Sequence, residues 1–171
     1  MDFYFKLKHW QVFSIQVIGL VLLYVSFSDP FLTKVVHSVS FLLIHLWVII
    51  IGLETNNYVS EAEEKSNAFF LINVMLVIGV YIFLIMSGIN NVTLTGWYAL
   101  IGFYFIFAFL QIYIFGANSL NRLYRSAGRK EVESSISLFF MLLFWPVGIW
   151  AIQPKLNRVV EKIELKESEE A

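Results

Sequence analysis

Four polar side chains interrupt the apolar stretches of the sequence, and their types could support chemistry: Gln16, His45, Asn73 and Gln111. An imidazole titrates near neutral pH, so His45 could have a proton-linked or gating role. Amide side chains form hydrogen bonds between membrane helices. These residues therefore either line a polar path or hold helices together, with a neutral His45 bonded to a neighbouring helix. Both interpretations stay open.

The histidines do not form the pattern of a metal or haem site. His37 precedes His45 by eight residues, which places the two about 80° apart around a helix and too far apart to bind one ion. There is no cysteine, which excludes thiolate ligands. HExxH, GxSxG, P-loop and GxGxxG motifs are also missing. We therefore expect no metal, no cofactor and no catalytic residues, and hence no enzyme.

An acidic cluster lies between the second and third apolar stretches: Glu54, Glu61, Glu63 and Glu64. Carboxylate oxygens bind hard cations, but the spacing matches no EF-hand. A solvated loop, a cation-collecting pore mouth and a dock for a basic partner are all compatible with this cluster.

A basic cluster falls in the predicted loop 118–135: Arg122, Arg125, Arg129 and Lys130. Retention of positive residues on the cytoplasmic side of a membrane accounts for such a cluster. Binding of anionic lipid headgroups is the alternative. The net charge of −1 and the lack of a basic stripe argue against nucleic acid as a partner.

The elements that must position these residues are membrane-spanning helices. No Asp, Glu, Lys, Arg or His occurs from Ser66 to Asn121, and one bilayer crossing takes about 20 residues. Hydrophobic residues make up 58% of the chain and charged residues 15%. The sequence therefore predicts an all-α integral membrane bundle with four transmembrane helices, at about residues 10–28, 35–53, 68–87 and 97–117.

A fifth apolar stretch, 136–152, contains Trp145 and Pro146 near its middle. Proline removes a backbone donor, so we expect a broken helix there, which crosses as a kinked span or returns as a re-entrant hairpin. We favour four full spans and a broken fifth element. Pro154 fits the first position of a short C-terminal amphipathic helix. The predicted domains are thus a transmembrane part, 1–153, and a cytoplasmic helix with an acidic tail, 154–171.

The distribution of lysine and arginine predicts the orientation. With the N-terminus inside, the inner segments hold seven Lys and Arg residues before residue 136, and the outer loops hold only Lys34. Positive residues are retained on the cytoplasmic side. We therefore predict a multi-pass protein of the inner (cytoplasmic) membrane with a cytoplasmic N-terminus.

Two stretches carry a resemblance: residues 6–13 (Lys-Leu-Lys-His-Trp-Gln-Val-Phe) and residues 144–157 (Phe-Trp-Pro-Val-Gly-Ile-Trp-Ala-Ile-Gln-Pro-Lys-Leu-Asn). Together they resemble small multi-pass membrane proteins of Bacteroidetes bacteria that have no assigned activity. The resemblance implies a bacterial inner membrane and no particular chemistry. The second stretch also resembles the re-entrant segment of dispanins, and no functional residue is carried over.

Two functions fit these observations. The first is a non-enzymatic accessory or regulatory subunit, which acts through cytoplasmic loops on a soluble partner or within a larger membrane complex. The alternative is a homo-oligomeric pore or small transporter embedded in the lipid bilayer. In a pore the four deep polar residues should face a common axis, whereas in an accessory subunit they should pair between helices.

Overall fold

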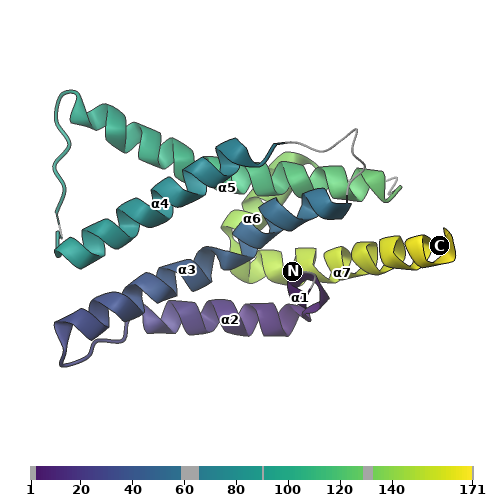
Figure 1. The fold of residues 1–171 in the computed structure, drawn as a ribbon, viewed down its shortest axis with the longest axis horizontal. Coiled ribbons are helices and arrows are strands. Elements are labelled where there is room, and N and C mark those ends of the chain that lie inside the picture. Colours follow the sequence, from purple (N-terminus) through teal and green to yellow (C-terminus); the bar gives the residue numbers. More distant parts are fainter. Residues whose placement is uncertain (1–2, 59–65, 90, 129–132, 171) are drawn as a thin grey trace.

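The computed structural model describes residues 3–58, 66–89, 91–128 and 133–170. These residues form seven α-helices and one 3-10 helix, with no strand among them (Figure 1). The all-α prediction is confirmed. The elements are α1 (Phe3–Lys6), α2 (His9–Leu22), α3 (Pro30–Glu54), η1 (Thr55–Tyr58), α4 (Ala68–Ser87), α5 (Tyr98–Ser126), α6 (Ser135–Leu143) and α7 (Trp145–Glu170).

Three helices are long and apolar enough to cross a membrane, namely α3, α4 and α5. Helix α2 is apolar but has only 14 residues, which span about 21 Å, against a hydrocarbon core of about 30 Å. The helix predicted over 10–28 therefore ends early, at Leu22. After it the chain reverses, because Asp29 caps α3 by accepting a hydrogen bond from the Phe31 N–H and Pro30 occupies the first turn.

The other predicted spans differ from the helices mainly at their ends. Helix α4 has the predicted bounds, and Gly88 ends it in the left-handed conformation, with φ of 71°. Helix α5 continues nine residues past the predicted end at Ala117 because its buried face continues with Leu120, Leu123 and Tyr124. The region predicted as a loop from 118 is therefore helical as far as Ser126.

The fifth apolar stretch forms one arm of a helical hairpin and the beginning of the other. Helix α6 ends at Leu143, the backbone of Phe144 is non-helical, and α7 begins at Trp145. In Figure 1 the turn lies in the middle of the molecule, and both arms point to the same end.

The prediction that Pro154 starts a separate helix is wrong, because α7 runs through this residue without interruption. Ile149, Ile152, Leu156 and Val159 form one buried stripe on both sides of the proline. Burial of this stripe offsets the backbone hydrogen bond that a proline inside a helix removes. The boundary predicted between residues 153 and 154 thus falls inside one helix.

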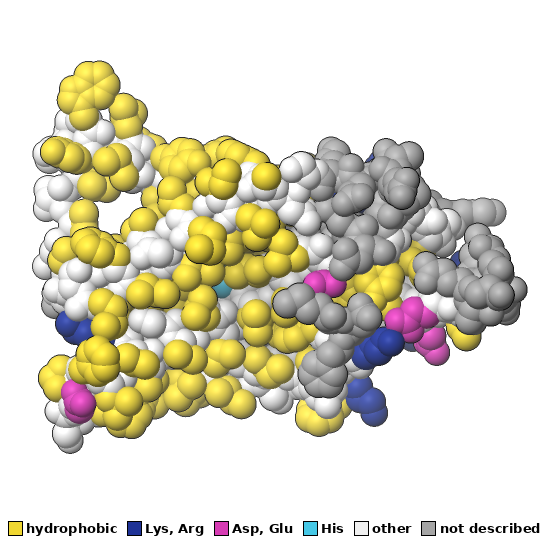
Figure 2. Space-filling model, viewed as in Figure 1, with side chains coloured by type: hydrophobic (Ala, Val, Ile, Leu, Met, Phe, Trp, Pro, Cys, Tyr) yellow, Lys and Arg dark blue, Asp and Glu magenta, His cyan; other side chains and the backbone are white. Residues whose placement is uncertain are grey.

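The bundle has two different ends. We call one end the base: α1, η1, α7 and the last turns of α3 and α5. We call the opposite end, with residues 23–29, 88–89 and 91–97, the far end. The first and last described helices, α1 and α7, both belong to the base (Figure 1). On the face drawn in Figure 2, hydrophobic side chains cover the middle of the molecule, and charged side chains lie towards its two ends.

Candidate functional site

Gln153, which is fully buried in α7 at the base, forms hydrogen bonds to several other segments of the chain. Its side-chain oxygen accepts a hydrogen bond from the Trp47 indole N–H at 3.0 Å. Its amide nitrogen donates to the backbone carbonyls of Tyr4 and Leu7, at 3.3 and 3.2 Å. One side chain thus joins α7 to α3 and to the N-terminal segment.

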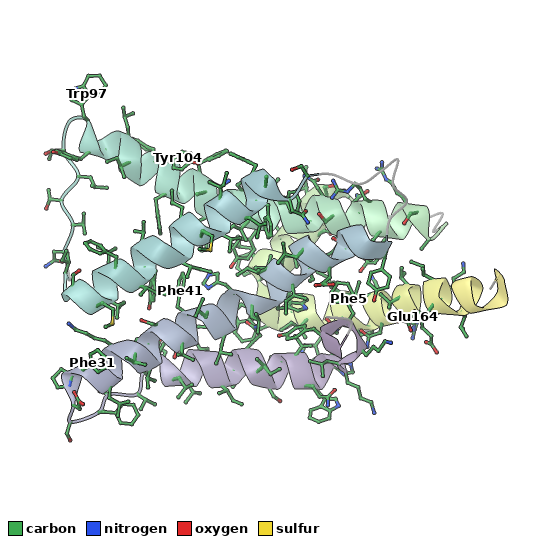
Figure 3. The ribbon with its side chains drawn as sticks, viewed as in Figure 1. Phe5, Phe31, Phe41, Trp97, Tyr104 and Glu164 are labelled. Carbon is green, nitrogen blue, oxygen red and sulfur yellow. The ribbon has the colours of Figure 1, made fainter. Side chains whose placement is uncertain are left out.

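Further contacts join the same two parts of the chain. The Asn157 amide donates to the Leu7 carbonyl at 2.9 Å, and the Lys6 and Glu164 side chains form an ion pair at 2.9 Å. Phe5, labelled in Figure 3, is 1% exposed between these contacts. We use the name base latch for the five residues that the hydrogen bonds of Gln153 and Asn157 join: Tyr4, Leu7, Trp47, Gln153 and Asn157.

Gln16 lies at the junction of α2 and α3. Its amide donates to the Leu43 carbonyl at 2.9 Å, and its side chain is fully buried. The Tyr4 hydroxyl and the Gln16 side-chain oxygen are buried, and neither forms a hydrogen bond with a described residue. Burial raises the pKa of the Tyr4 phenol to about 12, against a smaller opposing effect of the Gln16 side chain. Gln16 therefore serves as a contact between helices in this structure.

His45 is surrounded by aromatic rings and bonds within its own helix. Its Nδ1 atom lies 2.8 Å from the Phe41 carbonyl oxygen, one turn earlier in α3. The Phe41, Phe109 and Tyr113 rings lie against it at centroid distances of 4.2 to 6.4 Å. The predicted bond to a neighbouring helix is replaced by this bond within α3. This imidazole is 8% exposed, and its contacts with the Phe109 and Tyr113 rings hold α3 against α5.

Asn73 and Gln111 are brought together between α4 and α5. The Asn73 amide donates to the Gln111 side-chain oxygen at 3.2 Å and to the Phe69 carbonyl at 3.1 Å. The Tyr104 hydroxyl donates to the Asn73 oxygen at 3.1 Å. Sequence reasoning missed Tyr104, which Figure 3 labels on α5. The four deep polar residues thus occupy three separate contacts.

The acidic cluster is described only in part. Glu54 is 6% exposed in the last turn of α3, whereas Glu61, Glu63 and Glu64 lie outside the described residues. Within the part of the chain that the structure describes, no three His, Cys, Asp or Glu side chains gather closely enough to hold a metal ion.

The basic cluster is described in part as well, because Arg129 and Lys130 lie outside the described residues. Arg122 and Arg125 belong to the end of α5. The Arg122 guanidinium donates to the Ser119 hydroxyl at 2.9 Å and lies 5.8 Å from the centre of the Phe115 ring. Arg122 is therefore held against its own helix, and Arg125 is exposed.

A sequence signal for Gln153 did exist. It lies in the register of the buried stripe of α7, four residues after Ile149 and three before Leu156. A lone amide within an apolar stripe needs an internal partner because unpaired buried polar groups are costly. Its partners near the N-terminus are backbone carbonyls, and no residue type in the sequence marks them. The chain matches no protein-family model, no curated protein and no solved structure.

Proposed function

We propose that this chain is a non-enzymatic accessory subunit of a bacterial inner membrane, with its base on the cytoplasmic side. The observation that carries this proposal is that the deep polar groups bond within the bundle. Gln16 bonds to α3, His45 bonds within α3, and Asn73 bonds to Gln111. A pore or a catalytic site needs polar groups that face a shared space, and these groups hold helices in place.

The orientation rests on the charges of the base. Among the described lysine and arginine side chains, only Lys34 lies near the far end; Lys8 lies between α1 and α2, and the rest belong to elements of the base. Cytoplasmic segments of membrane proteins are enriched in such residues. The hairpin of α6 and α7 then enters from the cytoplasmic side and returns to it as a re-entrant element. Its turn carries exposed apolar side chains, including Phe144 and Val147, that suit contact with lipid.

The proposed surface for a soluble partner is the exposed side of α7 that carries Arg158 and Lys162. This helix extends past the other elements at the base (Figure 1). Arg158 and Lys162, one turn apart on one side of α7, are exposed and form no ion pair with any described residue. The base latch fixes α7 at the other end of this segment, so the two charges are presented on a rigid support. A partner with an acidic surface complements them.

Two measurements test the proposal. Affinity purification from the native membrane should recover a stoichiometric partner, which the double variant Arg158→Glu, Lys162→Glu loses and the far-end variant Thr93→Glu keeps. Liposomes that contain the purified chain should show no ion flux. The proposal is overturned if flux occurs and falls in His45→Ala or Gln111→Ala, because those residues would then line a conduction path.

A further inference from the structure

One face of α5 carries a regular repeat along the edge of the helix beside α4, where Tyr104, Phe107 and Gln111 contact α4 and stay partly exposed. Its residues are spaced alternately by three and four positions, which is the repeat of two helices packed side by side with a left-handed crossing. We call this set the α5 seam: Trp97, Leu100, Tyr104, Phe107, Gln111, Ile114 and Asn118.

The large side chains of the seam are open to the surroundings along the whole helix. Trp97 is 85% exposed at the far end, where Figure 3 shows it pointing away from the bundle. Leu100, Phe107 and Ile114 are 58%, 49% and 46% exposed. Lipid tails can cover apolar side chains of this kind, so exposure alone does not define a partner.

Two polar positions of the seam, Gln111 and Asn118, keep amide groups that lipid cannot satisfy, whereas the Tyr104 hydroxyl already donates to Asn73. Tyr104, Gln111 and Asn118 follow one another at intervals of seven residues. The Gln111 oxygen accepts from Asn73, but no hydrogen bond joins the Gln111 nitrogen to any described acceptor. Asn118 is exposed and makes no hydrogen bond with the described residues. Hydrocarbon offers no acceptor to such groups, whereas another amide offers both a donor and an acceptor.

The seam continues into a groove at its inner end. Ile114 and Asn118 line it on α5, and Ser135, Ile136 and Phe140 line it on α6, with a volume of about 450 Å³. Ile136 and Phe140 are 69% and 51% exposed. The groove widens the surface beside Asn118 and leaves room for side chains from another helix.

We propose that the α5 seam binds the same seam of a second copy of this chain. Two copies in one membrane have the same orientation, so a twofold axis along the membrane normal pairs their α5 helices in parallel. Each seam residue then meets its own equivalent. Gln111 meets Gln111 and Asn118 meets Asn118, and the partial positive charge of each NH2 group faces the partial negative charge of an amide oxygen. An unrelated helix would have to reproduce the same seven-residue register of amides.

The exposed area is adequate for such a pair. Aromatic side chains bury roughly 150–250 Å² each, so the three aromatic residues of the seam, all at least two-fifths exposed, contribute on the order of 350 Å². With the aliphatic residues of the seam and the α6 side of the groove, the surface approaches the ~800 Å² per partner of a stable interface. The proposal does not depend on the accessory role described above.

Cysteine cross-linking in native membranes tests the interface directly, because the chain has no cysteine of its own. Ile114→Cys should form a disulfide-linked dimer under mild oxidation, since equivalent residues on the axis come within bonding distance. The matched control is Met75→Cys, 71% exposed on α4 and on the side of that helix away from Asn73. Equal cross-linking at the two positions, or none at Ile114→Cys, overturns the proposal.

A second measurement separates the interface from the fold of one copy. Gln111→Leu also removes the bond to Asn73, whereas Asn118→Leu removes no bond within the described chain. Both variants should raise the dimer dissociation constant in lipid by roughly threefold to tenfold, and Met75→Leu should leave it unchanged. A wild-type chain that stays monomeric throughout the dilution series, or an unchanged constant in Asn118→Leu, contradicts the pairing.

Discussion

The base differs from the half of the bundle towards the far end, which we call the far half, in what its side chains contact. At the base, Gln153 is fully buried, and both the oxygen and the nitrogen of its side-chain amide form hydrogen bonds. In the far half, Trp97, Ile101 and Phe103 on α5 are each more than 60% exposed. The base is thus held by contacts that the chain makes with itself, whereas the outer turns of α5 depend on what surrounds them.

This difference separates two sources of stability in one small membrane protein. Hydrogen bonds among buried groups specify a single arrangement because a buried donor or acceptor that loses its partners is costly. Apolar side chains that face lipid specify no particular arrangement, because lipid tails are as apolar as they are. We therefore expect substitutions at the base to be costly and substitutions in the far half to be mild.

The largest effect is expected at Gly148, close to the turn of the hairpin. A Cβ atom there would overlap the Met141 carbonyl oxygen, and a backbone atom cannot move aside as a flexible side chain can. Gly148→Ala should lower the free energy of unfolding by at least about 3 kcal/mol. The control, Gly79→Ala on α4, meets open space and should be neutral or stabilising by up to about 1 kcal/mol. Unfolding in bicelles measures both, and equal stabilities would contradict the tight turn.

An effect almost as large is expected at Gln153. Leucine at this position has a similar size but leaves the Trp47 N–H without its acceptor and removes one of the two hydrogen bonds to each of the Tyr4 and Leu7 carbonyls. Gln153→Leu should cost about 3 kcal/mol and free the N-terminal segment. Hydrogen exchange of the amides in residues 4–7 checks this release. Unchanged protection there would show that the latch is not what holds the segment.

The smallest of the three effects is expected at Asn73, where the far half and the base meet. Asn73→Leu removes its bonds to Gln111 and Tyr104, and hydrogen bonds between membrane helices contribute about 0.6 kcal/mol on average. We expect a loss of roughly 1 kcal/mol, in the same unfolding assay, with Met75→Leu as the neutral control. A loss as large as that of Gln153→Leu would remove the distinction between the two regions.

The sequence predicted well what depends on local patterns. The apolar runs predicted the helical class, and the apolar run 68–87, followed by the turn residue Gly88, predicted α4 with its observed bounds. The extension of α5 past Ala117 was missed because polar residues such as Asn118 and Asn121 suggested a loop. Their neighbours on the helix, Leu120 and Tyr124, are buried against other elements, and this burial keeps the segment helical.

Contacts between distant segments could not be predicted in this way. The partners of Gln153 in the N-terminal segment are main-chain carbonyls, which every residue has, so no residue type marks them. Asn73 and Gln111 were identified as candidates for contacts between helices, and the structure pairs them. That pairing needs the relative rotation of α4 and α5, which their periodic sequences do not encode by themselves.

The base latch has a consequence for the order in which the molecule is made. Gln153 and Asn157 bond to residues that precede them by about 150 positions. The ribosome synthesises α1 first. The carbonyls of Tyr4 and Leu7 therefore have no partner on α7 until α3, α4 and α5 have been inserted and α7 has been synthesised. Closing so long a loop also carries a large entropy cost. Assembly of the base is therefore the last step of biogenesis, and it joins the first part of the chain to the last.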